Sequence, residues 1–333
     1  MARAVNIGEA GVAPASRRAH RAGPKPGRLI RPRTVNRPTG SPRMQRPLAL
    51  PYLFIAPAVG LTVLFSLVPL GILAYRSLFA SAGIFATSLH FVGFQNYVNA
   101  ISQGGGKALE VTAIYTVAFV VGSMALGLGI ALLLNIKLPG LSFLRAPFVI
   151  PLVVPTVATA LIWANIFAPQ FGFINRILVG VGLPQADSTS SPSLALVMVL
   201  TFGIWQFFGE NVILYLAALK TLPTEVLEAA SVDGAGPWRR FINVRWPLLR
   251  RHTVLIWVIT TLTGLQTFTQ IYVLTGGGPS GATTTALFYV YNQGFVQFNT
   301  GQADSMGVLL FLISLAVTVT QVGLIGRGAR RGY

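Results

Sequence analysis

The sequence predicts an all-α integral membrane protein with six transmembrane helices. Its 333 residues are 53% hydrophobic and only 10% charged, too few charges for a water-soluble domain with so much apolar surface. Six apolar stretches are long enough to cross a bilayer, because about 30 Å of hydrocarbon needs about 20 helical residues. Basic residues are concentrated between these stretches, as in other multi-pass membrane proteins.

The third expected span is rich in proline. It contains Pro147, Pro151 and Pro155, so we expect a kinked helix whose freed carbonyl groups are bonded by neighbouring helices. The six spans are expected at residues 48–75, 111–136, 144–168, 194–218, 253–274 and 307–326.

Residues 1–47 differ in composition from the rest of the chain. They hold 11 of the 25 Lys and Arg residues and almost no large apolar side chains, which predicts a disordered basic tail. Arg17 and Arg18 do not form a twin-arginine signal, because no apolar run follows for roughly 30 residues. We therefore expect two parts, a cytoplasmic tail at 1–47 and a six-span transmembrane domain at 48–333.

The basic residues also predict the orientation. If the N-terminus is inside, the inside segments carry 22 Lys and Arg residues and the outside loops carry only Lys107 and Arg176. This asymmetry places both termini and segment 219–252 in the cytoplasm. Because the charge follows the topology, it does not indicate a nucleic-acid partner.

Several chemistries are excluded or disfavoured by the sequence. There is no cysteine, so disulfides, thiolate metal sites and Cys nucleophiles are impossible. His20, His90 and His252 are too dispersed to suggest a metal site or a catalytic triad. No phosphate-binding loop motif occurs, and Gly104–Lys107 resembles one only superficially. We expect no enzymatic activity and no cofactor on this chain.

The most informative segment is residues 228–247, EAASVDGAGPWRRFINVRWP. We expect a short helix at Leu222–Ala235 that is capped by Thr221 or Thr224. Gly234 can either end this helix or turn the chain. The aromatic residues from Trp238 onward predict a second short helix before Pro247 starts the fifth span.

This segment resembles the coupling loop of ATP-binding-cassette importer permeases. Their pattern is E-A-A, three residues, G, nine residues and I-x-L-P. Here Glu228 and Gly234 match, while Val244 and Trp246 replace the usual Ile and Leu. Further segments are similar to those of sugar permeases: Phe91–Tyr97 (FVGFQNY), Trp163 followed by Gly172–Asn175 (GFIN), and Gly276–Pro279 (GGGP) with Ala282–Thr285 (ATTT).

The resemblance implies the type I ABC importer permease fold in the carbohydrate and glycerol-phosphate (maltose-type) branch, with a permease core at about 107–326 and a coupling loop at 221–250. It implies four partners: a second homologous permease, a cytoplasmic ATPase dimer that binds the ATP and Mg, an extracytoplasmic solute-binding protein and a sugar substrate. The expected location is the bacterial cytoplasmic membrane. The residues expected to contact the ATPase are Glu228, Ala229, Ala230, Asp233, Gly234 and Ala235.

A substrate path is expected between the two spans that flank the coupling loop. Glu210 is the only acidic residue inside a predicted span, and an ionisable residue at membrane depth is usually functional. Gly203, Phe207 and Glu210 share one helical stripe, and Thr260, Gly264 and Thr267 form a matching one. The competing interpretation is that Glu210 pairs with the partner permease while the glycines and threonines pack helices. Further polar candidates are Gln206, Asn211, Gln266, Gln270 and Tyr272.

Two classes of solute fit the sequence, a sugar and a glycerol phosphate or related polyol. No span interior supplies Lys or Arg, which favours a neutral sugar over a glycerol phosphate or a related polyol. The loop Gly276–Ala282 is interpreted either as a gate or binding-protein contact, or as an ordinary exposed turn. An ion-coupled carrier is disfavoured, because such a protein usually has several ionisable residues in its spans.

Overall fold

The computed structural model describes residues 49–80, 90–135, 141–182, 185, 187 and 190–330. The tail predicted for residues 1–47 lies outside the described residues. The chain divides into unit 1–56 and unit 57–333. In the first unit the described residues form the start of helix α1, and every other element lies in the second unit.

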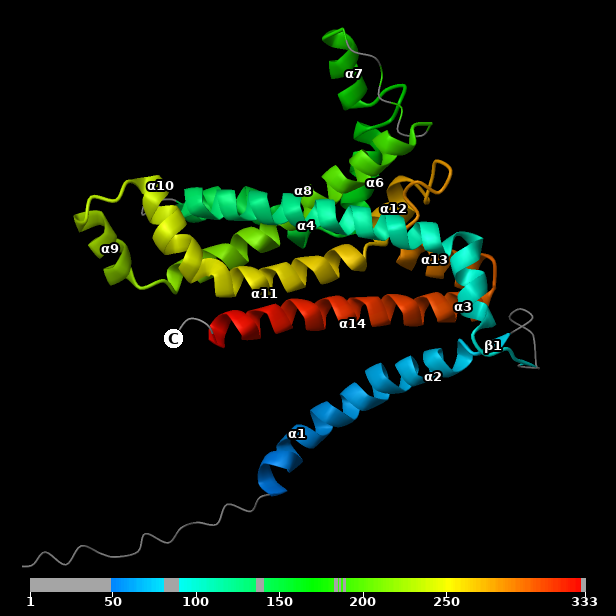
Figure 1. The fold of residues 1–333 in the computed structure, drawn as a ribbon. Coiled ribbons are helices and arrows are strands. Elements are labelled where there is room, and N and C mark those ends of the chain that lie inside the picture. Colours follow the sequence, from blue (N-terminus) through cyan, green and yellow to red (C-terminus); the bar gives the residue numbers. More distant parts are fainter. Residues whose placement is uncertain are drawn as a thin grey trace, which may run out of the picture. The chain divides into compact units, whose positions relative to one another are not determined.

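The regular secondary structure of the described chain is helical, apart from one short antiparallel strand pair in which Phe79 faces Phe91. Figure 1 shows the elements in chain order: α1 (Ala49–Thr62), η1 (Val63–Leu67), α2 (Val68–Arg76), β1 (Phe79–Ala80), β2 (His90–Phe91), α3 (Gln95–Ala100), η2 (Ile101–Gly105), α4 (Gly106–Leu134), α5 (Leu141–Val153), α6 (Thr156–Ile166), α7 (Phe173–Gly180), α8 (Pro192–Lys220), α9 (Thr224–Val232), α10 (Pro237–Arg240), η3 (Phe241–Arg245), α11 (Trp246–Leu265), α12 (Thr269–Leu274), α13 (Ala286–Tyr291), η4 (Asn292–Val296) and α14 (Thr300–Arg330).

The predicted transmembrane fold is confirmed. Five helical segments of the described chain are long and apolar enough to cross a membrane, and a sixth span results if the bent pair α5–α6 is one span. The kink expected in the third span is a break at Val154 and Pro155, where the chain bends by 104°. Many large apolar side chains on these helices are exposed, which suits a surface covered by lipid or by other subunits.

Some predicted span boundaries were wrong. The span expected at 111–136 corresponds to α4, which begins earlier, at Gly106, and ends at Leu134. Helix α3 precedes it across a kink at Gln103 and Gly104, where the backbone is not helical, so that α3 and α4 run in different directions (Figure 1). The polar residues before 111 hid this extension in the hydropathy pattern. The last helix similarly begins at Thr300 rather than at 307.

Two helices accommodate a proline by means of a π-helical turn just before it. The π-helical turns η1 and η3 are each followed by one residue and then by a proline, Pro69 and Pro247. In each turn the N–H of that intervening residue reaches back five positions, from Val68 to Val63 and from Trp246 to Phe241. A proline in a regular helix clashes with the preceding turn, and the wider turn gives its ring room. The predicted second short helix is thus not separate, because α10, η3 and α11 run on without a break.

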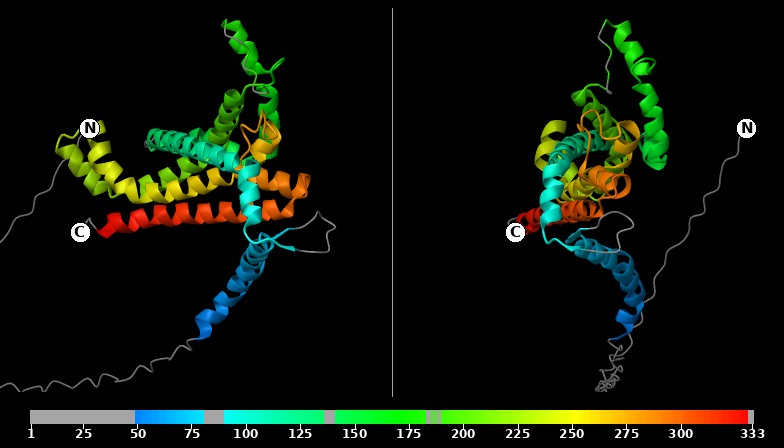
Figure 2. Two further views of the ribbon diagram at one scale, coloured as in Figure 1. Left: turned by 45° about the vertical axis from the view of Figure 1, so that its right-hand side comes forward. Right: turned by 90° about the vertical axis from the view of Figure 1, so that its right-hand side faces the viewer.

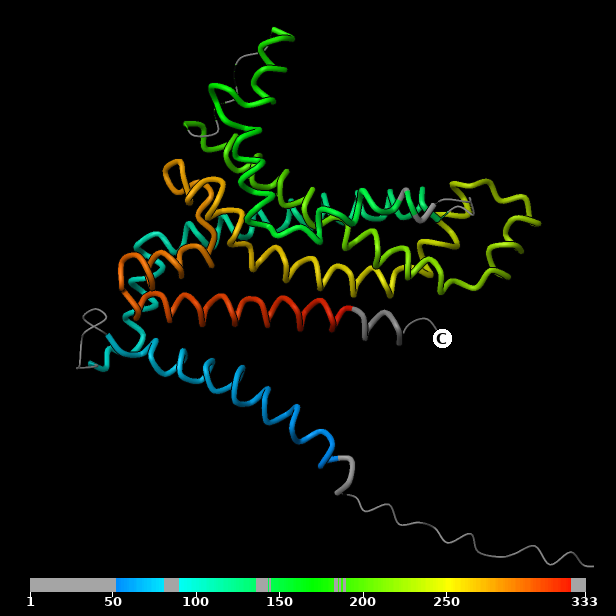
Figure 3. Tube along the Cα trace, turned by 180° about the vertical axis from the view of Figure 1, so that it is seen from behind, coloured from blue at the N-terminus to red at the C-terminus, as the bar shows by residue number. Residues whose placement is uncertain are grey.

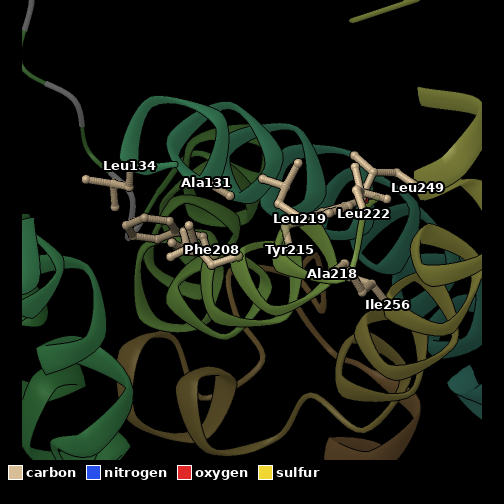
Figure 4. Close-up of a cluster of buried hydrophobic side chains, with 11 residues drawn as sticks. Ala131, Leu134, Phe208, Tyr215, Ala218, Leu219, Leu222, Leu249 and Ile256 are labelled. Atoms are coloured by element: carbon tan, nitrogen blue, oxygen red, sulfur yellow. The ribbon is translucent and has the colours of Figure 1, made fainter. Parts of the chain in front are cut away.

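The core is formed where α4, α8 and α11 pack together. Figure 4 shows one cluster of buried apolar side chains drawn from these helices, and Leu222, which precedes α9, is part of it. Gly127 allows α4 to approach α8, since a Cβ there would meet Asn211 Cβ at 2.5 Å. Leu222 therefore anchors the start of the α9 segment to the bundle.

The long helices of residues 57–333 run between two ends. Helices α9 and α10 lie at one end, which we call the basic end, and α3, α12 and α13 lie toward the opposite end, which we call the loop end (Figures 1, 2 and 3). At the loop end Arg76 Nε lies 3.2 Å from Asp304 Oδ2, which ties α2 to α14.

Candidate functional site

Helix α9 projects from the basic end with no buried residue of its own. The expected cap is not formed: Pro223 occupies the N-cap position, and no side chain bonds the helix start. Thr221 is instead the C-cap residue of α8, where its hydroxyl donates to the Ala218 carbonyl at 2.8 Å. The helix is also shorter than the predicted Leu222–Ala235.

Gly234 ends α9, one of the two roles predicted for it, through a specific backbone motif. Its φ is +75°, in the left-handed region that glycine adopts without strain. The Ala235 N–H bonds the Ala230 carbonyl at 3.0 Å, and the Gly234 N–H bonds the Ser231 carbonyl at 3.2 Å. These two bonds define a Schellman motif. Glycine is needed here for its backbone conformation alone, since a Cβ would meet nothing within 4 Å.

The predicted ATPase-contact residues form an accessible surface. Glu228, Ala229, Asp233 and Gly234 are exposed, while Ala230 and Ala235 are half-buried. The segment is braced from behind, because Arg240 Nη1 donates to Ser231 Oγ at 2.6 Å and so joins α10 to α9. The result is a short helix that carries two small residues and is joined to α10 at the end of the bundle.

A second feature is formed where two helices are broken. At the α5–α6 break, Pro155 offers no N–H to the Pro151 carbonyl. The side-chain amide of Gln206 on α8 donates instead to the carbonyls of Pro151 and Val154, and its Oε1 accepts from Thr159 Oγ1 at 2.9 Å. The expectation that neighbouring helices bond the freed carbonyls is confirmed.

The other break separates α11 from α12 at residues 266–268. The Thr285 hydroxyl donates to the freed Thr267 carbonyl at 2.9 Å. Gln270 Nε2 contacts Thr267 Oγ1 at 3.3 Å and Tyr115 Oη of α4 at 3.2 Å. Side chains from elsewhere in the fold thus fix this irregular backbone.

A cavity of about 240 Å³ lies at these two breaks. It carries hydroxyls, amides and two aromatic rings, but no charged side chain. Broken helices at a cavity are a common way to build a solute site in transporters. Its lining residues are Thr156, Phe207, Thr263, Gln266, Thr267, Phe268, Thr269 and Gln270.

Only two of the six residues predicted for the substrate path line the cavity at the helix breaks. Phe207 and Thr267 line the cavity. Gly203 and Gly264 lie against α4, since a Cβ at Gly203 would overlap Tyr115 Oη and one at Gly264 would meet Thr116 Cγ2 at 3.0 Å. Thr260 is placed at the α8 interface.

The Thr260 hydroxyl lies 2.8 Å from Asn211 Oδ1 and from the Ile256 carbonyl oxygen. Glu210 is partly exposed and outside the cavity, and within the described part of the chain it has no ion pair or hydrogen bond.

The five further polar candidates for the substrate path also lie in different surroundings. Gln266 lines the cavity and is exposed, and Gln270 lines it while bonded to Tyr115. Gln206 and Asn211 are engaged in the contacts given above. Tyr272 packs on Phe268 and Tyr291. Sequence reasoning missed Thr156, Thr263, Phe268 and Thr269, although the run TLTGLQTFTQ at 261–270 is unusually rich in Thr and Gln for a membrane span.

This architecture defines a class, an α-helical membrane subunit with an uncharged cavity in its helices and an exposed helix at one end. Residues 123–331 match the family model described as "Binding-protein-dependent transport system inner membrane component". The chain belongs to this family.

Curated relatives cover nearly the same region. The chain is 33% identical over 285 residues to the sn-glycerol-3-phosphate transport system permease protein UgpA of Agrobacterium fabrum, covering 85% of this chain and 97% of the relative. It is 32% identical to the sulfoquinovosyl glycerol transport system permease protein SmoG of the same organism, with 83% and 90% covered. It is 33% identical to the multiple sugar-binding transport system permease protein MsmF of Streptococcus mutans, with 70% and 81% covered.

A solved structure has the same fold. A chain of a bacterial ABC transporter involved in the import of the acidic polysaccharide alginate superimposes with a TM-score of 0.72 over 84% of this chain and 95% of that chain, at 20% identity. The expected ABC importer permease fold is therefore confirmed.

Proposed function

We propose that this chain is one of two membrane subunits of an ATP-driven importer, and that α9 is its contact with a cytoplasmic ATPase dimer. The observation that carries the proposal is the exposed α9, capped by Gly234 and braced by Arg240, on a chain of this transport family. The basic segments around α9 support a cytoplasmic location for it and for both termini. ATP and Mg would be bound by the ATPase, and this chain would itself carry out no catalysis.

The movement follows from the way α9 is attached. Leu222 anchors one end of the segment in the core, and at the other end α10 continues into α11. A displacement of α9 by the ATPase would therefore be transmitted to α8 and α11, the helices that lead to the cavity. Such rigid-body movement of packed helices is an established way to alternate access.

The solute class that we propose is a small hydroxylated compound, a sugar or a glycerol derivative delivered by an extracytoplasmic binding protein. Phe207 and Phe268 offer ring faces to apolar sugar surfaces, and the threonines and glutamines offer hydrogen bonds to hydroxyls. The uncharged lining supports a neutral sugar. The names of UgpA and SmoG make a glycerol phosphate or related anionic polyol the second candidate.

Co-purification tests this proposal. The tagged chain, gently solubilised, should bring down a second permease and a nucleotide-binding subunit, and the ATPase should be lost from Glu228→Arg while the second permease is retained. A chain that purifies alone and transports its solute on an ion gradient without ATP would refute the proposal.

A further inference from the structure

The segment FVGFQNY at 91–97 leads into α3 (Gln95–Ala100) and has no part in the function proposed above. Helix α3 lies at the loop end, and Figures 1 and 2 show it lying across the direction of the long helices α4 and α14. Arg76 ends one membrane span, and Gly106 begins the helix of the next. A crosswise helix between the ends of two spans lies at the level of the membrane surface.

One side of α3 is fixed to the rest of the fold. The buried side-chain amide of Asn96 donates to the carbonyl oxygens of Ser77 and Phe79, both at 2.9 Å. Ser305 of α14 donates to the Asn96 carbonyl oxygen at 3.2 Å, and Tyr97 Oη lies 2.7 Å from Ser77 Oγ. These contacts fix how α3 is rotated about its axis, and so fix the directions of its other two sides.

The second side of α3 is apolar and exposed. Phe94, Val98 and Ile101 are spaced as i, i+4 and i+7, which places them on one stripe of the helix. They have 74%, 57% and 49% of their surface exposed, and Phe91, just before the helix, has 70%. We call Phe94, Val98 and Ile101 the apolar stripe. An exposed apolar surface of this kind marks a contact with a partner or with a membrane.

The third side of α3 is polar and uncharged. Gln95 and Asn99 lie one turn apart on it, and Gln95 Nε2 donates to Asn99 Oδ1 at 2.9 Å. The sequence holds no charged residue between His90 and Lys107. An apolar side next to a polar side is typical of a helix at a membrane surface, where the apolar side enters the bilayer and the polar side faces water.

Aromatic rings connect this surface with the end of a membrane span. The ring of Tyr75, an exposed residue of α2, lies 4.6 Å from that of Phe79, and the Phe79 ring lies 5.4 Å from that of Phe91. Phe94 and Tyr97 form a further ring contact at 5.6 Å. Aromatic side chains are enriched where membrane proteins cross the bilayer surface. Because the exposed surface of α3 continues that of a span, its position favours lipid over a soluble partner.

We propose that α3 is an interfacial helix that rests in the bilayer leaflet at the loop end. The apolar stripe lies among the acyl chains next to the headgroups, and Gln95 and Asn99 face water. This contact holds the connection between α2 and α4 at a fixed depth. The proposal rests on the membrane fold alone and does not depend on ATP coupling or on the solute.

Spin labelling in lipid tests the proposal, because the chain has no cysteine. The full-length chain, with the subunits that purify with it, carries a nitroxide at Val98→Cys on the apolar stripe. The matched control is Gln95→Cys, at an exposed position on the polar side. Phe94→Cys repeats the test at a second position on the stripe. Each protein is reconstituted in nanodiscs of phosphatidylcholine and phosphatidylglycerol, and collisions of the label with oxygen and with a water-soluble nickel chelate are measured by electron paramagnetic resonance.

We expect the labels at Val98→Cys and Phe94→Cys to collide more with oxygen, which concentrates in hydrocarbon, than with the nickel chelate. Their depth should be about 5–10 Å within the boundary of headgroups and acyl chains. The label at Gln95→Cys should show the reverse preference.

Two results would overturn the proposal. Access of the nickel chelate to the stripe labels as high as to Gln95→Cys would mean that the stripe faces water. Low access of both reagents to the stripe labels would mean that protein covers it. Appearance of that shielding only after a solute-binding protein is added would identify the stripe as a protein contact.

Discussion

Gln206 on α8 donates hydrogen bonds to the backbone carbonyl of Pro151 on α5, at the point where proline has removed the natural donor. The Gln206 side chain is only 1% exposed, and its burial is explained by these hydrogen bonds to the backbone. Because the same amide also bonds Val154 and Thr159, this one side chain holds both sides of a 104° bend. The bend in turn places Thr156 in the wall of the cavity at the helix breaks.

Replacing Gln206 by Leu should therefore destabilise the protein. The substitution leaves buried carbonyls unpaired, at a cost of about 1–3 kcal/mol in the free energy of unfolding. Thermal unfolding of the detergent-solubilised chain measures the effect. Gln266→Leu, an exposed amide near the same cavity, is the matched control and should change stability little. Equal behaviour of the two variants would contradict the role assigned to Gln206.

Gly234→Ala should impair coupling through the backbone alone. A Cβ meets nothing at this position, so the cost comes from the φ of +75°, at about 1–2 kcal/mol. We expect lower ATP-driven uptake in proteoliposomes and less co-purifying ATPase, with normal membrane insertion.

Gly236→Ala is the control for this variant, since Gly236 lies two residues away, has a φ of −63° and is equally unobstructed. It should behave like the unmodified protein. A loss of uptake in Gly236→Ala as severe as in Gly234→Ala would show that left-handed geometry is not the cause.

Gly203→Ala should disturb the packing of α8 on α4. The added methyl would overlap the hydroxyl of Tyr115, a fully buried side chain, and overpacking of this kind costs about 1–3 kcal/mol. A lower unfolding temperature is the expected result. Gly129→Ala, at an open position on α4, should be neutral. If Gly203→Ala unfolds at the unchanged temperature, the close contact between the two helices is not required.

Phe207→Ala should weaken solute uptake, because the Phe207 side chain lines the cavity at the helix breaks. Some loss of stability should accompany it, since the ring also packs on Phe119. We expect KM for the transported solute to rise about tenfold or more, because the loss of an apolar contact in a binding pocket costs roughly 1–3 kcal/mol. Glu210→Gln should leave KM unchanged, since Glu210 lies outside the cavity. The reverse pattern, with KM sensitive to Glu210 and not to Phe207, would move the path to the other side of α8.

The sequence allowed the membrane class, five of the six spans and the proline-rich bend of α5–α6 to be predicted, because hydropathy and proline content are local properties. It also offered Gly234 as a possible end of α9, because glycine geometry is likewise local. It did not allow the beginning of α4 at Gly106 to be predicted, since the polar residues before 111 carry no hydropathy signal. It also misplaced the α9 cap, because Thr221 is used by the preceding helix. Gly203, Phe207 and Glu210 do lie on one helix, α8, as their spacing predicts. Which neighbour each of them faces, however, depends on tertiary packing.

The central claim, that α9 contacts the ATPase, is tested most directly by cross-linking. The chain has no cysteine, so Ala229→Cys introduces a unique thiol on the exposed helix, and Phe295→Cys introduces one on the exposed surface of η4. In the assembled complex a short bifunctional thiol–amine reagent should join the Ala229→Cys chain to the ATPase subunit and should leave the Phe295→Cys chain unattached to it. An active complex in which Ala229→Cys fails to cross-link to the ATPase, or in which Phe295→Cys does so instead, would contradict the account.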